Sequence, residues 1–490
     1  MSTTELLRRE WTTFRRPARL IALSLAALAV IALGLVSAAR NQSSCAGDCP
    51  AVPIAGDGSF VGDRFWFRHR DLGPEGSVTV RLTALTGTIT YPPPDHDRIV
   101  PGLVPWAKAG IIVKDGVRPG SRYAALAMTG AHGVRFQYDY QHDVAGSAGG
   151  VSPRSPRWLR LTRSGDTITG AESADGKQWQ TVATVKLDRL PDTVQVGLFA
   201  TSPGDLTLKR TGLGGATEQV RFTQAVGVFD HVVADGGGAW TSEPVGEMNQ
   251  TDWEKHHHAS GAVDDNGVVT VSGTGDIGPL SEDSVRSVEN TLPGLVFALI
   301  IVLVIAARYG ARTARETTAR PVRAARAGVV GAAAFVTGLV ATGVVIPAGL
   351  AILKGNGILV QPSPVLTDVR VIVGVAAVLA VCAVLAYGLG VWLRRGWAAV
   401  LIGLSVVAVP FAVTAIPLLP DPVSEWLLRV TPAAGFAVQQ TLVEYPQVTA
   451  HYAPSAGYFP LPGWAGLAVL CGYTIVALRL ALGGKPAGWR

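Results

Sequence analysis

The chain has 490 residues, of which 48% are hydrophobic and only 16% are charged. Soluble globular proteins usually carry about 25% charged residues, and the deficit here lies in apolar stretches, whereas residues 40–291 have an ordinary soluble composition. The net charge of +6 comes from arginines clustered beside two apolar stretches, which is the pattern of short cytoplasmic segments. These features exclude a wholly soluble chain and argue against nucleic acid as the partner.

Residues 1–19 predict a cytoplasmic amphipathic helix at the membrane surface. Trp11 and Phe14 share one helical face, arginines flank them, and Pro17 ends the run. Aromatic anchors beside basic residues are typical of helices that lie in the bilayer interface. An unstructured tail before a signal sequence is the alternative.

The first transmembrane helix is predicted at residues 20–39, a run without a charged residue. A run of this length can cross the roughly 30 Å hydrocarbon core of a bilayer. A cleaved signal peptide competes with this interpretation, because residues 37–39 (SAA) resemble a cleavage site. The apolar region of a signal peptide spans only about 7 to 15 residues, so we expect an uncleaved helix.

Residues 40–291 predict an extracellular, all-β sandwich, with a linker at 275–291. Several short segments alternate apolar and polar residues, and clusters of Gly, Asp and Pro separate them. This alternation is typical of half-buried strands, and many short strands at this spacing favour an antiparallel sandwich.

Four pieces of this region share a pattern with a known fold family: 108–112 (KAGII), 158–161 (WLRL), 173–176 (SADG) with Trp179, and 196–200 (VGLFA). On these pieces residues 106–202 resemble a concanavalin A-like, laminin-G-like jelly roll. The resemblance implies a jelly-roll sandwich.

Aromatic side chains on a jelly-roll face could stack on sugars. The alternative is that they belong to the sandwich core. The candidates are Trp66, Trp106, Tyr138 and Tyr140.

Cysteine and metal chemistry offer few candidates in the extracellular region. Cys45 and Cys49 lie just outside the first membrane helix, and they form either a local disulfide or two free thiols. We expect no metal site at residues 256–258 (HHH), because consecutive side chains of an extended chain point to opposite faces. The acidic segments 95–97 and 264–266 lack the full spacing of an EF-hand loop and are expected to form turns. Calcium binding, which occurs in some jelly rolls, is the alternative.

Residues 292–490 predict a membrane domain with five further transmembrane helices. Six crossings would place both termini in the cytoplasm of a multi-pass protein of the cell membrane, with the sandwich outside. The basic loop 308–326 and the pair Arg394 and Arg395 then fall inside. The predicted spans are 292–307, 327–353, 371–393, 397–419 and 464–483.

Two local features of the membrane domain carry structural expectations. Pro410 and Pro417 should kink the fifth membrane helix, because each removes a backbone donor. Residues 421–445 are half apolar and too polar to span a bilayer, so we expect an interfacial or re-entrant helical pair there.

Four segments of the membrane part share a pattern with a known family: 10–12 (EWT) with the basic stretch that follows, 317–327 (TTARPVRAARA), 331–341 (GAAAFVTGLVA) and 461–477. On these segments the membrane part resembles the permease subunits of type-2 ABC exporters, particularly those of actinobacteria. The resemblance covers most of residues 1–40 and 292–490, but the loop 308–326 holds few acidic residues and the extracellular insert is unusually large.

The resemblance implies an export permease that has no motor of its own. No G-x-x-x-x-G-K-[ST] phosphate loop occurs in the chain, so ATP and Mg would be bound by a separate ATP-binding subunit. We therefore expect no catalytic residue and no cofactor here, and a dimer with a second copy or a second permease.

In that family, the N-terminal surface helix and the loop after the second membrane helix contact the ATPase. Solvated positive-inside charge is the alternative role for these arginines. The positions that correspond are Glu10, Trp11, Arg15, Arg16, Arg312, Arg315, Glu316 and Arg323.

The predicted function is therefore that of a permease subunit of an ATP-driven exporter in the lipid bilayer. Its jelly roll would recognise the exported substrate or an extracellular glycan. The alternative is a membrane-anchored glycan-binding or sensor protein, although an anchor needs only one helix.

Overall fold

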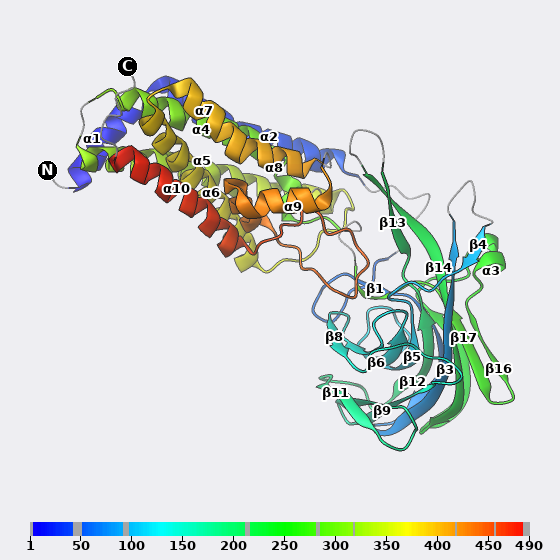
Figure 1. The fold of residues 1–490 in the computed structure, drawn as a ribbon. Coiled ribbons are helices and arrows are strands. Elements are labelled where there is room, and N and C mark those ends of the chain that lie inside the picture. Colours follow the sequence, from blue (N-terminus) through cyan, green and yellow to red (C-terminus); the bar gives the residue numbers. More distant parts are fainter. Residues whose placement is uncertain are drawn as a thin grey trace.

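The computed structural model describes residues 3–42, 51–91, 98–210, 216–280, 285–316, 319–416, 419–454 and 457–483. Figure 1 shows an elongated helical bundle with a β domain at one of its ends. Helix α1 (Thr3–Phe14) and the C-terminal end of α10 (Gly463–Gly483) lie at the opposite end of the bundle.

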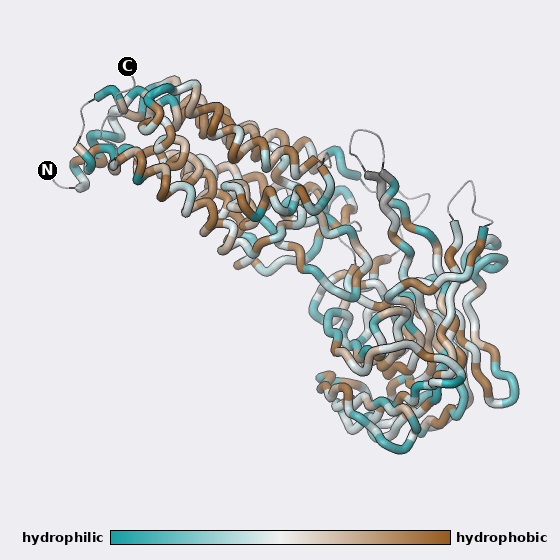
Figure 2. Tube along the Cα trace, viewed as in Figure 1, coloured by the Kyte–Doolittle hydropathy of each residue, from teal (hydrophilic) through white to brown (hydrophobic). Residues whose placement is uncertain are grey.

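Six helical units of the described chain are long and apolar enough to cross a membrane. Figure 2 shows their hydrophobic residues along the body of the bundle and hydrophilic residues at its far end. The protein is therefore a multi-pass membrane protein. The units are α2 (Pro17–Arg40), α4 (Leu295–Thr313), α5 (Arg320–Gly355), α6 (Val365–Leu393), the continuous unit Gly396–Ala415, and α10.

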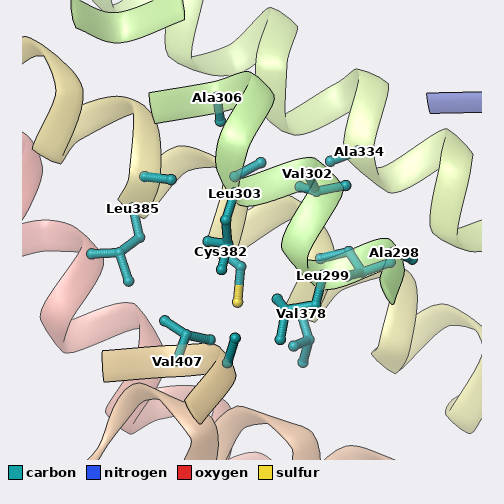
Figure 3. Close-up of a cluster of buried hydrophobic side chains, with 14 of the residues drawn as sticks. Ala298, Leu299, Val302, Leu303, Ala306, Ala334, Val378, Cys382, Leu385 and Val407 are labelled. Atoms are coloured by element: carbon teal, nitrogen blue, oxygen red, sulfur yellow. The ribbon is translucent and has the colours of Figure 1, made fainter. Parts of the chain in front are cut away.

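The centre of the bundle is a close contact between α4 and α6. Figure 3 shows Leu299 and Leu303 of α4 packed with Val378 and Cys382 of α6. Nearer the basic end, a Cβ at Gly310 would clash with the carbonyl oxygen of Tyr387. Small residues let helix backbones approach closely in lipid, where packing rather than the hydrophobic effect drives association.

Helix α5 starts earlier than the predicted span at 327–353. It runs over 36 residues from Arg320, about 54 Å at the usual rise of an α-helix, which exceeds the thickness of a hydrocarbon core. The arginines 320, 323 and 326 are therefore helical rather than part of a loop.

The fifth membrane unit is interrupted close to Pro410. A π-helical turn, η4 (Leu404–Ala408), separates α7 (Gly396–Gly403) from α8 (Val409–Ala415). Such a turn is one way in which a helix accommodates a lost backbone hydrogen bond. Pro417, the second predicted kink, lies outside the described residues.

The segment predicted as a helical pair contains one α-helix, α9 (Asp421–Val430), followed by a 3-10 helix, η5 (Pro432–Gln439). Every residue of η5 is buried. A Cβ at Gly466 of α10 would clash with the backbone of Ala434, so η5 packs directly on α10 and forms part of the bundle.

The β domain is a sandwich of two large antiparallel sheets. The nine-stranded sheet has the order β11-β10-β9-β3-β14-β17-β16, with β4 paired to β3 and β13 paired to β14. Its strands are β3 (Glu75–Thr90), β4 (Ile99–Pro101), β9 (Arg157–Ser164), β10 (Thr167–Ser173), β11 (Gln180–Lys186), β13 (Asp205–Arg210), β14 (Ala216–Ala234), β16 (Gly261–Asp265) and β17 (Val268–Gly273).

The seven-stranded sheet has the order β15-β2-β12-β5-β6-β7-β8. A further pair, β1 (Val61–Asp63) with β18 (Ile277–Pro279), is antiparallel. The strands of the seven-stranded sheet are β2 (Phe65–Leu72), β5 (Lys108–Lys114), β6 (Tyr123–Thr129), β7 (Val134–Tyr138), β8 (His142–Ala145), β12 (Val194–Thr201) and β15 (Gly237–Val245).

The seven-stranded sheet is buried on both faces at its centre. Ile111 of β5 belongs to the core between the sheets, whereas its neighbour Ile112 packs with Phe67 and with Ile277 of β18 on the other face. Consecutive residues of β5 and β6 are consequently all buried. Part of the predicted linker is therefore strand β18, which belongs to the sandwich. The sequence pattern did not indicate this strand, because three residues are too few to show alternation.

Candidate functional site at the basic end of the bundle

Helix α1 packs against α5 at the basic end of the bundle. The chain then breaks at Arg16, which has an extended backbone, and α2 begins at Pro17. Phe14 is buried, while Trp11 is exposed and lines an apolar cavity of about 630 Å³ between α2 and α5. The expected amphipathic helix is thus an α-helix with one buried face.

A buried ion pair joins α1 to α5. The Nε of Arg326 donates to Oε2 of Glu10 at 2.7 Å, and only 7% and 4% of the two side chains are exposed. Breaking a buried pair on one side typically costs about 3–5 kcal/mol, because it leaves an uncompensated charge. The pair therefore fixes the position of α1 on the bundle.

The same guanidinium reaches a third segment. Nη2 of Arg326 lies 2.8 Å from Oε2 of Glu316, which follows the C-terminal end of α4. The side chain of Glu316 is 56% exposed. Arg326 thus links α1, the segment after α4 and the first turns of α5, and one of its two acidic partners reaches the surface.

Aromatic contacts continue the link from α1 toward α4. The rings of Phe14 and Tyr309 meet edge to face with centroids 5.3 Å apart. The guanidinium of Arg19 lies 4.4 Å from the centroid of Tyr309 and donates to the carbonyl oxygen of Phe14 at 3.1 Å. Arg19 therefore caps the C-terminal end of α1 and packs α2 against α4.

The predicted surface positions divide into two groups. Arg15, Arg16, Arg312 and Arg315 are exposed, as expected for residues that face a partner or solvent. Glu10 is not a surface residue: its carboxylate is buried, because Arg326 neutralises it. Among the remaining positions, Arg323 is half-buried and donates to the carbonyl oxygen of Ala481 near the end of α10, at 3.1 Å.

The prediction missed Arg326, Arg19 and Tyr309. One signal was present in the sequence: Glu10 is an acid in a strongly basic segment that leads into the membrane, and such a charge needs a partner. The sequence did not indicate which of many arginines that partner is.

The predicted stacking aromatics do not form one face. Trp66 and Tyr138 pack against the core between the sheets, and Tyr138 also stacks on His142 at 4.3 Å. Tyr140 is buried in the cluster on the other side of the seven-stranded sheet, and its hydroxyl donates to Asp63 at 2.7 Å. Trp106 is buried and stacks on His132 at 4.0 Å.

The remaining candidates lie in turns, in a short helix or outside the described residues. Asp264 accepts a hydrogen bond from the amide of Gly267 at 3.2 Å, in the turn between β16 and β17. The histidines 256 and 257 are helical, in α3 (Asp252–His257), and not extended as assumed. The described residues contain no cluster of three or more metal-ligating side chains. Cys45, Cys49 and the segment 95–97 lie outside the described residues.

A cavity of about 600 Å³ lies at the junction of the sandwich and the bundle. Asp57 and Gln141 of the sandwich, Leu350 of α5 and Thr367 of α6 contribute to its wall. A hydrogen bond of 3.2 Å from Gln447 to the carbonyl oxygen of Gln141 connects the two parts nearby. The end of the bundle nearest the sandwich therefore opens onto a space that both parts line.

Comparison with known proteins leaves the family open. No family model matches the chain, and no curated protein matches it. Among solved structures, a functionally unknown protein from Saccharomyces cerevisiae is similar over 41% of this chain and 94% of its own, with 15% identity and a TM-score of 0.22. SCP-B, a member of the eqolisin family of peptidases, is similar over 43% and 98%, with 8% identity and a TM-score of 0.25.

A third solved structure is the GH43 protein BlXynB, in mutant form, from Bacillus licheniformis. It is similar over 30% of this chain and 26% of its own, with 15% identity and a TM-score of 0.18. These TM-scores are too low to carry an argument about the activity of this chain.

Proposed function

We propose that this chain is the permease subunit of an ATP-driven exporter of the type-2 ABC class. ATP would be hydrolysed by a separate cytoplasmic subunit that docks on the basic end of the bundle. In this proposal both termini lie in the cytoplasm, and the sandwich lies outside as a jelly-roll recognition module. The permease would work as a dimer with itself or with a second permease.

The observation that supports this proposal best is the three-way link at Arg326. A docking partner that displaces Glu316 pulls on a guanidinium that also holds Glu10. Because Arg326 belongs to α5, the displacement would act on α1 and on a helix that runs through the bundle. Arg312 and Arg315, which precede Glu316 in the chain, are exposed cations and offer attraction to an acidic partner.

The cavity at the other end of α5 fits the same proposal. Leu350 is in its wall, so a rigid movement of α5 would change the cavity where an exported molecule leaves the bundle. The sandwich residues in that wall would then contact the molecule first, as a recognition module should.

The test is to reverse charge at the proposed docking surface. We expect the chain, extracted in mild detergent with its native neighbours, to copurify with an ATP-binding subunit. The double variant Arg312→Glu/Arg315→Glu should reduce the recovered subunit at least tenfold. Lys354→Glu is the matched control, because Lys354 is an exposed cation at the opposite end of α5.

Two results would contradict the proposal. One is the absence of any ATP-binding subunit under conditions that preserve other transporters. The other is equal recovery from the double variant and the control.

A membrane-anchored glycan-binding or sensor protein is the second candidate. The feature that favours it is a cavity on the sandwich that lies apart from the bundle. Ligand binding without a copurifying ATP-binding subunit would favour this candidate over the exporter.

A further inference from the structure

A small cavity of about 280 Å³ lies on the flank of the sandwich, between β14 and the short helix α3. Figure 1 shows α3 next to β14 on this flank. Phe222 of β14, Trp253 of α3 and His258, which follows α3, line the cavity together with Arg64. Its size is near the lower end of the range for small-molecule sites.

Polar groups in the wall of this cavity lack partners within the described chain. His258 is only 4% exposed, and neither of its ring nitrogens makes a hydrogen bond to a described residue. The same holds for Nε1 of Trp253 and Nε of Arg64. Buried polar groups are nearly always hydrogen-bonded in native proteins, so these three groups around one cavity are donors and acceptors that a ligand in the cavity can satisfy.

The surrounding contacts hold these groups in place. Thr251 and Glu254 form a capping box that fixes the start of α3. Glu254 also forms an ion pair with Arg64 at 2.8 Å, and the ring of His257 stacks on Trp253 with centroids 4.9 Å apart. The wall is therefore organised before any ligand binds.

The charges of the wall are balanced. Arg64 is paired with Glu254, and Arg221 is paired with Asp205. Burial lowers the pKa of His258, which favours its neutral form with one donor and one acceptor nitrogen. A balanced wall favours a neutral ligand that both donates and accepts hydrogen bonds.

The aromatic rings define the shape of the ligand. Phe222 is 57% exposed, and its ring is tilted by 55° from Trp253 and by 42° from His258. Trp253 and His258 are tilted by 51° from each other. Rings at these angles do not form a parallel slot for a flat heterocycle, but they can contact the C–H faces of a puckered ring.

We propose that this cavity binds one neutral sugar ring. Phe222 would contact its apolar face, and His258, Trp253 and Arg64 would hydrogen-bond its hydroxyls. The inference deepens the recognition role proposed for the sandwich, but it does not depend on export.

The experiment uses the full chain in lipid nanodiscs. Methyl glucoside, methyl galactoside and N-acetylglucosamine are titrated separately, with adenosine as a flat heterocyclic comparison, and heat of binding is recorded. We expect saturable binding of at least one sugar. His258→Ala and Phe222→Ala should each weaken that binding at least tenfold, while His256→Ala, at an exposed position of α3, should leave it unchanged.

Phe222→Ala keeps the test decisive if His258→Ala fails to fold, because Phe222 is largely exposed. Three outcomes would overturn the proposal: no sugar in the set binds, adenosine binds more tightly than every sugar, or sugar binding persists in the Phe222 variant. Recovery of an ATP-binding subunit is measured separately, so failure of the sugar site and failure of the export proposal are distinguishable.

Discussion

Two buried ion pairs, one in the sandwich and one in the bundle, solve the same physical problem in different ways. In the sandwich, Nζ of Lys114 lies 2.6 Å from Oδ2 of Asp63, and both side chains are fully buried. In the bundle, Arg326 lies 2.7 Å from Glu10, and both side chains are almost fully buried. Each pair removes two charges from water, which only close geometry and further hydrogen bonds can offset.

The partners beyond each pair differ. The sandwich pair is completed by Tyr140 and by the backbone of Gly120 and Ser121, all of them buried. The bundle pair is completed by Glu316, whose side chain is half exposed. The first pair therefore closes a core, whereas the second reaches from the core to the surface. Only the second can respond to a molecule that docks from outside.

The largest effect is expected in the sandwich. Lys114→Met leaves the carboxylate of Asp63 buried without its cation, and we expect a loss of about 3–5 kcal/mol in the free energy of unfolding of this domain. Thermal unfolding of the full chain in detergent, followed by fluorescence, should show an early transition. Lys186→Met, at an exposed lysine, should leave the transition in place. Equal behaviour of the two variants would contradict a structural role for the buried pair.

The bundle pair should give a smaller and more local effect. Glu10→Gln keeps the shape of the side chain but removes its charge, while Glu316 still neutralises Arg326. We expect a cost of about 1–3 kcal/mol, the range for a poorly satisfied buried polar group. Hydrogen exchange should accelerate in α1 and leave the sandwich unaffected. Protection of α1 equal to that of the unmodified chain would show that the pair does not hold this helix.

A change at Glu316, the exposed partner of Arg326, should separate the effect on stability from the effect on function. Glu316→Gln should change the free energy of unfolding by no more than about 1 kcal/mol, because exposed ion pairs contribute little. If the ATP-binding subunit docks at Glu316, the variant should nonetheless reduce transport-coupled ATP hydrolysis severalfold. Glu425→Gln is a suitable control, because Glu425 also pairs with an arginine, Arg429, on a half-exposed helical face. Equal ATP hydrolysis by the Glu316→Gln and Glu425→Gln variants would contradict the proposal that the ion pair of Arg326 and Glu316 responds to a docking subunit.

The two ion pairs also show which features of the structure the sequence predicts. Local patterns predicted the membrane helices and the strands, because hydropathy and alternation are properties of short segments. The partners of Glu10 and Asp63 are far away in the chain, at Arg326 and Lys114, and no local pattern marks them. Tyr140 was a candidate for sugar stacking, but its burial depends on contacts that its neighbours in the sequence do not reveal.

The cavity on the flank of the sandwich illustrates the same limit. His258 belongs to a run of three histidines that invites a metal interpretation. The structure instead places His257 against Trp253 and buries His258 beside Phe222. That separation depends on the short helix α3, which begins at the capping box of Thr251 and Glu254. A capping box is a local pattern and does not indicate the distant contacts of His258.

The smallest effect on stability is expected at the junction between the sandwich and the bundle. Glu289, an acid that belongs to neither ion pair, lies there. The half-buried carboxylate of Glu289 accepts hydrogen bonds from the backbone amide and the hydroxyl of Thr441, the latter at 2.8 Å. Burial raises the pKa of Glu289 above its ordinary value, although the hydrogen bonds act in the opposite direction.

The direction of the pH effect at Glu289 follows from linkage. An acid whose pKa is raised on folding binds more protons in the folded state, so its contribution to stability is present at low pH. That contribution is lost as the pH rises from the ordinary glutamate pKa through the raised value. Glu289→Gln should therefore flatten this decline and leave the chain slightly more stable at neutral pH, as measured by unfolding temperatures from pH 4 to pH 8. If the unfolding temperature of this variant falls with rising pH as steeply as that of the unmodified chain, Glu289 does not titrate in this range. Its carboxylate would then respond to pH no more than the fully buried pair of Lys114 and Asp63 in the sandwich.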